Sequence, residues 1–184
     1  MPASTDLLPF PAMSLNRIRT PCIGVCSTTF GDTVCRGCKR FLHEVVNWNG
    51  YTGEQKQIIW TRLDSLLRLV VSNYVVVSDP GRLRQQMEYQ NIRFQAELSP
   101  EGWVPELLKA SGQQPLDWPA FGLTPLAEAL TLLPGQLYQQ ISEEMHALSQ
   151  AHYDRSHGQQ ARPVREIIIR EGLADASDAA PGST

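Results

Sequence analysis

The sequence predicts a mainly α protein in which a small four-cysteine metal knuckle is followed by a multi-helix body. All four cysteines lie between positions 22 and 38 of the 184-residue chain. Further along the chain, apolar residues recur at helical spacing in several segments. Hydrophobic residues make up 42% of the chain and charged residues 19%, a composition that supports a packed core.

The chain divides into four predicted parts. Residues 1–19, rich in Pro, Ser and Thr, form a flexible leader, and residues 20–76 form the cysteine-rich metal-binding unit with its helices. Residues 77–157 form an α-helical extension, and residues 158–184 a linker and disordered tail. The apolar stretch "VREIIIREG" in the tail either binds a partner or docks back onto the helical body.

The two cysteine pairs are expected to face one another across a short hairpin or knuckle. The intervening sequence "STTFGDTV" places a Gly31-Asp32 turn between residues that favour extended backbone. The next segment, "RFLHEVVNWNG", predicts a short helix that ends at Gly50 and buries Val45, Val46 and Trp48.

Thr52 begins the most regular predicted helix. Gln55 follows three residues later, the spacing of a capping box. The apolar stripe that follows has the periodicity of an amphipathic helix, with members Ile59, Leu63, Leu66 and Val70. "YVVVSDPG" is either a short strand or the end of this helix.

Four further helices are predicted after residue 78. Asp79 and Pro80 have the pattern of an N-cap and first helical residue, and Pro100 begins a helix that ends near Gly112. "QQPLDWPAFGLTP" is expected to be a connection held by Trp118 and Phe121, and "PLAEALTLL" a short helix. "GQLYQQISEEMHALSQAHYDRS" predicts a longer helix with an apolar face.

The cysteines have the spacing of a metal site. Cys22, Cys26, Cys35 and Cys38 form the pattern C-x3-C-x8-C-x2-C. Four thiolates suit either a tetrahedral zinc ion or an iron–sulfur cluster, so the spacing does not identify the metal. Disulfides, a thioredoxin-like pair and unligated cysteines are less favoured, because the chain shows neither an export signal nor a βαβ pattern.

Basic residues surround the cysteines. They are Arg17, Arg19, Arg36, Lys39 and Arg40. Such cations would offset the charge of about minus two on a four-thiolate centre and lower thiol pKa values. Alternatively, they form a basic surface that binds a protein or RNA partner, or they are ordinary solvated residues.

Composition and motifs restrict the function classes. The net charge of -3 argues against a general nucleic-acid binder. No Gly-rich phosphate loop, G-x-S-x-G or H-E-x-x-H motif is present, so no catalytic residues are predicted and an enzyme is not the favoured class. No apolar run is long enough for a membrane span, and the N-terminal region lacks a secretory signal, which favours the cytoplasm.

The stretch over residues 20–64 also resembles a bacterial family, number 1289 among the domains of unknown function. The motifs are "PCIGVC", "VCRGC", Trp48 followed by the Thr52 cap, and "IIWTRL". Members are described as predicted Fe–S proteins. The resemblance implies that the four cysteines are metal ligands of an iron–sulfur cluster and that Trp48 and Trp60 pack around the site.

The expected function is therefore that of a small intracellular four-cysteine metal-binding protein. Its role would be an accessory one in redox chemistry, sensing or binding of a protein partner. The alternative is a zinc-knuckle adaptor that holds one zinc ion and binds RNA or protein.

Overall fold

The computed structural model describes residues 18–157, which form five α-helices and one two-stranded sheet. This confirms the predicted mainly α class. The elements are α1 (Leu42–Val46), α2 (Gly53–Val71), β1 (Val75–Val77), α3 (Pro80–Tyr89), α4 (Pro100–Ser111), β2 (Leu123–Pro125) and α5 (Pro134–His157). Among these helices none is both long and apolar enough to pass through a membrane. Residues 1–17 of the predicted leader, which include Arg17, and the predicted tail with its "VREIIIREG" stretch lie outside the described residues.

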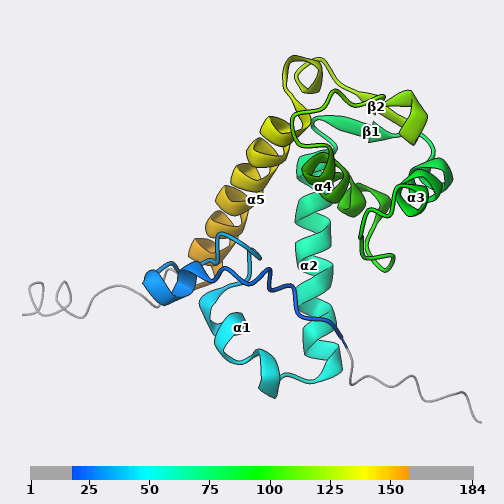
Figure 1. Cartoon of the computed structure of the whole chain (residues 1–184). Coiled ribbons are helices and arrows are strands. Elements are labelled where there is room, and N and C mark those ends of the chain that lie inside the picture. Colours follow the sequence, from blue (N-terminus) through cyan, green and yellow to red (C-terminus); the bar gives the residue numbers. More distant parts are fainter. Residues whose placement is uncertain (1–17, 158–184) are drawn as a thin grey trace, which may run out of the picture.

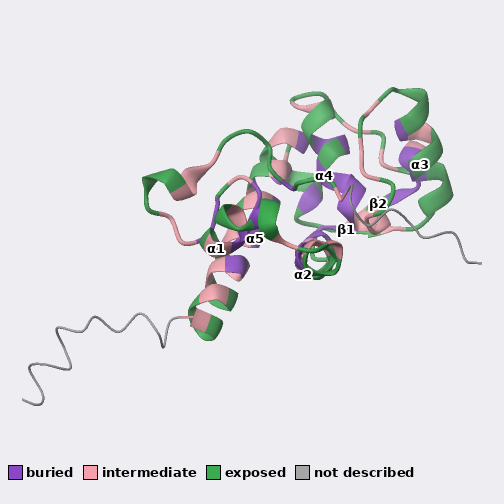
Figure 2. Ribbon diagram, turned by 90° about the horizontal axis from the view of Figure 1, so that it is seen from below, coloured by how far each residue is buried: buried purple, intermediate pink, exposed green. Residues whose placement is uncertain are grey.

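Helices α2, α4 and α5 pack against one another and enclose the main core (Figures 1 and 2). The predicted stripe on α2 is buried along its whole length. Facing it are Leu107 and Leu108 of α4 and Leu137 and Ile141 of α5, each at most 1% exposed. Residues from both the predicted metal-binding unit and the predicted extension therefore share one apolar cluster.

The predicted starts of α2 and α3 are confirmed. The Thr52 hydroxyl accepts a hydrogen bond from the Gln55 backbone N–H at 3.3 Å, and the Gln55 side chain accepts one from the Thr52 N–H at 2.9 Å. Asp79 accepts from the Arg82 N–H at 2.9 Å, and Pro80 is the first residue of α3. Each cap satisfies a backbone donor that the helix itself leaves without a partner.

The small sheet was predicted only in part. The "VVV" of "YVVVSDPG" forms strand β1, which pairs antiparallel with β2. In the predicted connection, Phe121 lies in the core and Trp118 packs against it, but the connection ends in strand β2, which was not predicted. The prediction of a helix over "PLAEALTLL" was wrong. The Leu126 N–H bonds the Tyr74 carbonyl at 2.7 Å and so extends the strand-like pairing, and only a 3-10 turn, Ala129–Thr131, remains before α5.

The backbone between the cysteine pairs also differs from the prediction. Ser27–Phe30 is a 3-10 helix rather than a hairpin strand. The Thr29 hydroxyl donates to the Cys26 carbonyl at 2.8 Å, a local bond that favours a turn. The β-bridge instead joins Val34 to Phe41, on either side of the second pair.

Helix α1 buries the Glu44 carboxylate, whereas Val46, which was predicted to be buried, is exposed. Val46 is 70% exposed, whereas Glu44 is only 6% exposed. Glu44 accepts hydrogen bonds from the Phe41 N–H at 2.8 Å and from the Arg62 guanidinium at 2.6 Å. This ion pair fastens α1 to α2.

We expect the packing of α2 to distinguish two leucines on the same helix. Leu66 is 6% exposed and Leu69 is 57% exposed. Leu66→Ala should lower the free energy of unfolding by about 2–5 kcal/mol, because it opens a cavity in the core. Leu69→Ala, measured by the same denaturant titration, should change it by less than about 0.5 kcal/mol. Equal losses would contradict the packing described.

Candidate metal centre

The second cysteine pair lies in a tight turn. The Cys35 N–H donates to the Arg40 carbonyl at 2.9 Å, and the Lys39 N–H donates to the Cys35 carbonyl at 2.8 Å. Lys39 itself has a φ of 60°, in the left-handed region that bulky residues rarely adopt. The turn buries both thiols, so that Cys35 is 1% and Cys38 8% exposed.

The Cys35 sulfur lies among hydrogen-bond donors. Burial by itself raises the pKa of this thiol. The backbone N–H groups of Cys38, Ser27 and Gly37, with the Cys38 side chain, outweigh burial and lower the pKa to about 7. The turn therefore stabilises a thiolate at Cys35.

The Cys38 sulfur faces a guanidinium group. The Nε of Arg40 donates to Cys38 Sγ at 3.3 Å. Burial raises the pKa of Cys38, while Arg40 acts in the opposite direction. The Arg40 guanidinium also lies 4.8 Å from the centre of the Trp48 ring, which places Trp48 beside the cysteine turn.

Two basic side chains are buried at this turn. Lys39 is 6% and Arg40 3% exposed. The Lys39 ammonium donates to Ser142 Oγ of α5 at 2.8 Å and to the Arg36 carbonyl. Among residues 18–157, no carboxylate lies within ion-pair distance of either cation, and the Nη1 of Arg40 has no partner there.

This burial corrects the predicted basic surface. Both side chains are buried, with Arg40 bonded to Cys38 Sγ and Lys39 to Ser142 Oγ, and so they do not form part of an exposed face. Arg19 and Arg36 remain exposed, and Arg36 pairs with Asp32 at 2.9 Å. The positions of Lys39 and Arg40 instead agree with the other prediction, that cations lie close to the thiols.

The first cysteine pair lies on a segment that touches the second turn. The Cys35 sulfur is 3.8 Å from the Val25 carbonyl, and the Arg36 N–H donates to Ser27 Oγ at 2.8 Å. These contacts come from the residues on either side of Cys26. A Cβ added to Gly37 would lie 2.8 Å from the Val25 carbonyl oxygen, so only glycine permits this approach.

The structure brings two of the four sulfurs together. Cys35 and Cys38 lie close enough for each thiol to affect the pKa of the other, whereas Cys26 is half-buried beside the Thr28 hydroxyl at 3.0 Å and Cys22 is exposed. None of the four is in a disulfide. Within residues 18–157, no group of three or more His, Cys, Asp or Glu side chains is placed to hold a metal ion.

Side chains far away in the sequence hold the cysteine segments in place. The Trp60 indole N–H donates to the Arg19 carbonyl at 2.8 Å, and Gln150 donates to Thr33 Oγ1 at 3.0 Å. Together with Ser142, they fix these segments to α2 and α5. No local sequence signal identifies Ser142 or Gln150, because each lies more than a hundred residues from its partner.

The comparison with family models agrees with the resemblance noted from the motifs. Residues 20–67 match the family described as "Protein of unknown function (DUF1289)". The match includes all four cysteines, α1 and most of α2, but leaves the larger part of the 184-residue chain unmatched. Comparison with curated proteins and with solved structures finds no match.

We expect Gly37→Ala to separate the two cysteine segments. The new methyl group would overlap the Val25 carbonyl, and an overpacked contact costs about 1–3 kcal/mol. Gly50→Ala is the matched control, because a Cβ there meets nothing within 4 Å. Thermal unfolding should show a clear loss for the first variant and little for the second. Similar stability in both variants would contradict the close approach.

Cys35 should titrate as an acidic thiol. In reduced, metal-free protein, thiolate absorbance in the ultraviolet should rise as the pH passes through about 7, because N–H donors lower the pKa of Cys35. The Cys35→Ser variant should lack this step. If the step persists in the variant, or if the wild type does not show it, the described hydrogen bonds to the sulfur are wrong.

Proposed function

We propose that this chain is a metal-binding protein in which Cys22, Cys26, Cys35 and Cys38 hold one metal centre. We further propose that the centre is an iron–sulfur cluster, as the family resemblance implies. One observation carries the proposal: two buried cations without carboxylate partners in the described residues lie beside the two buried thiols.

Charge balance supports a four-thiolate centre. Buried charges are costly unless they are paired. Burial lowers the pKa of Lys39, and the Cys35 and Cys38 thiols act in the opposite direction and favour the charged form of this lysine. A zinc ion with four thiolates, or an oxidised four-iron cluster with four thiolates, carries a charge of about minus two, which matches the two buried cations.

The arrangement of the two segments supports the ligand set. Cys35 and Cys38 already share one turn, and the residues around Cys26 touch that turn through Val25 and Ser27. The metal would draw the exposed Cys22 and the half-buried Cys26 toward the buried pair. Since metal binding supplies folding free energy, it would also stabilise this short segment.

The proposed role is an accessory one in electron transfer or sensing. An iron–sulfur cluster, when bound, accepts and releases single electrons. The residues of this chain would hold its thiolates: the Arg40 guanidinium at Cys38, and the N–H groups of Ser27 and Gly37 at Cys35. Hydrogen bonds of this kind tune the reduction potential of a cluster.

Metal analysis of protein purified without oxygen tests the proposal. We expect a brown protein that contains iron and acid-labile sulfide in equal amounts, and a strong loss of both when any one of the four cysteines is replaced by serine. If the protein contains one zinc per chain and no sulfide, the iron–sulfur proposal is wrong and the site is a zinc knuckle. Protein without bound metal would contradict both forms of the site.

Two arginine variants provide a matched control for the same measurement. Arg40→Gln removes the buried guanidinium at Cys38, whereas Arg36→Gln removes an exposed one from the same turn. We expect Arg40→Gln to weaken metal retention about tenfold or more, since partners of metal ligands contribute at this level. Arg36→Gln should retain the metal. Equal retention in both variants would contradict the charge argument.

A further inference from the structure

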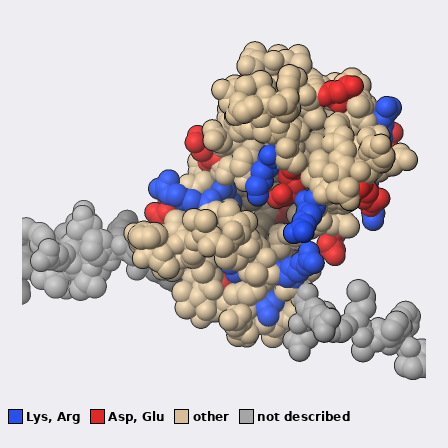
Figure 3. Space-filling model, viewed as in Figure 1, with Lys and Arg blue, Asp and Glu red and all other residues tan. Residues whose placement is uncertain are grey.

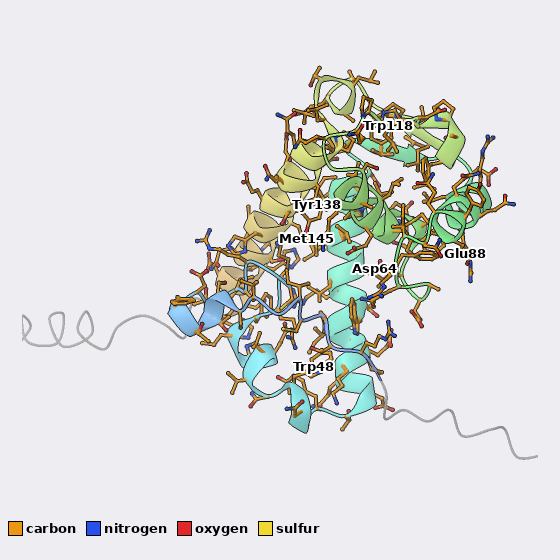
Figure 4. The ribbon with its side chains drawn as sticks, viewed as in Figure 1. Trp48, Asp64, Glu88, Trp118, Tyr138 and Met145 are labelled. Atoms are coloured by element: carbon orange, nitrogen blue, oxygen red, sulfur yellow. The ribbon has the colours of Figure 1, made fainter. Side chains whose placement is uncertain are left out.

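A cavity of about 340 Å³ lies between α2, α4, α5 and the segment that carries the first cysteine pair. Its volume is within the range of small-molecule sites, about 300–1,000 Å³. Tyr138 and Met145 of α5 line one side and Asp64 of α2 another, and Figure 4 labels all three around the space between these helices. The cavity shares Cys38 and Lys39 with the cysteine turn, whereas the rest of its wall lies outside the proposed metal centre.

Among the charged side chains of the cavity wall, four are basic and two are acidic. They are Arg19, Lys39, Arg93, Lys109, Asp64 and Glu106. This is an excess of cations in a chain whose net charge is -3. Figure 3 shows Lys and Arg side chains around a hollow near the centre of the molecule.

The excess of cations is available to a ligand. Asp64 already accepts hydrogen bonds from Ser99, at 3.2 Å from its N–H and 2.9 Å from its hydroxyl. In contrast, no salt bridge to Arg93 or Lys109 forms within the described part of the chain, and both side chains are exposed. An anionic group at the mouth of the cavity would therefore meet cations that have no carboxylate partner there.

The interior of the cavity is apolar and partly aromatic. Trp60, Leu67 and Phe94 contribute to it, together with Tyr138 and Met145. The Trp60 indole N–H is bonded to the Arg19 carbonyl at 2.8 Å, which fixes the orientation of this wall. A ligand that fits this cavity would therefore have an apolar body for the interior and a negative charge for the rim.

We propose that this cavity binds a small organic anion with an apolar body and one oxyanion group. The site adjoins the cysteine turn, because Cys38 and Lys39 form part of its wall. The proposal does not depend on the metal centre, since the cations at the rim and the apolar interior lie mainly on the helical body and the loop before α4.

A fluorescence titration with anilinonaphthalene sulfonate tests the proposal, with the neutral phenylnaphthylamine as its uncharged counterpart. We expect the anion to bind at one site per chain and to bind more weakly as salt rises, whereas the neutral probe should be insensitive to salt. Decanoate should displace the bound anion at lower concentrations than decanol does. Lack of binding, or equal salt dependence of the two probes, would overturn the proposal.

Charge variants locate the site. The double variant Arg93→Gln/Lys109→Gln removes two exposed cations at the rim and should weaken binding of the anion about tenfold. The control Arg68→Gln/Arg155→Gln removes two exposed cations that do not line the cavity and should leave binding unchanged. Thermal unfolding checks that both variants are folded. Equal affinity in the two double variants would also overturn the proposal.

Discussion

The burial of Lys39 and Arg40 beside Cys35 and Cys38 is the constraint on which the cysteine region depends. Placing one ion in a protein interior costs several kcal/mol unless a partner charge or hydrogen bonds offset it. Ser142 and Trp48 provide part of this compensation, through a hydrogen bond to Lys39 and a cation–π contact with Arg40. The remaining positive charge is matched if the sulfurs are anionic, which metal coordination ensures at neutral pH.

The helical body gives this turn its rigidity. Lys39 links the turn to α5, the Glu44–Arg62 pair links the following helix to α2, and Trp60 holds the preceding segment at Arg19. These contacts involve both α2 and α5, so a structural change at the sulfurs would be transmitted to two long helices. The basic cavity lies between the same helices and shares Lys39 with the turn, which places a ligand site and a candidate metal site in direct contact.

Local signals in the sequence predicted the fold, and contacts between distant residues explain where they failed. The Thr52 cap and the Asp79-Pro80 start depend on neighbours within four residues, and the structure has both. Strand β2 depends on pairing with β1. The exposure of Val46 depends on the ion pair that buries Glu44 on the same helix. The basic residues that neighbour the cysteines in the sequence predicted cations next to thiols. The burial of Lys39, however, depends on Ser142, which no local pattern reveals. The four-cysteine ligand set itself stays a prediction.

X-ray absorption at the metal edge of the purified protein tests the central claim most directly, because it reports the atoms bonded to the metal. If the four cysteines converge on one centre, the first coordination shell contains only sulfur, at about 2.3 Å for a zinc–thiolate site. A shell that includes nitrogen or oxygen ligands would show that the two segments do not close around the metal, and would contradict the account.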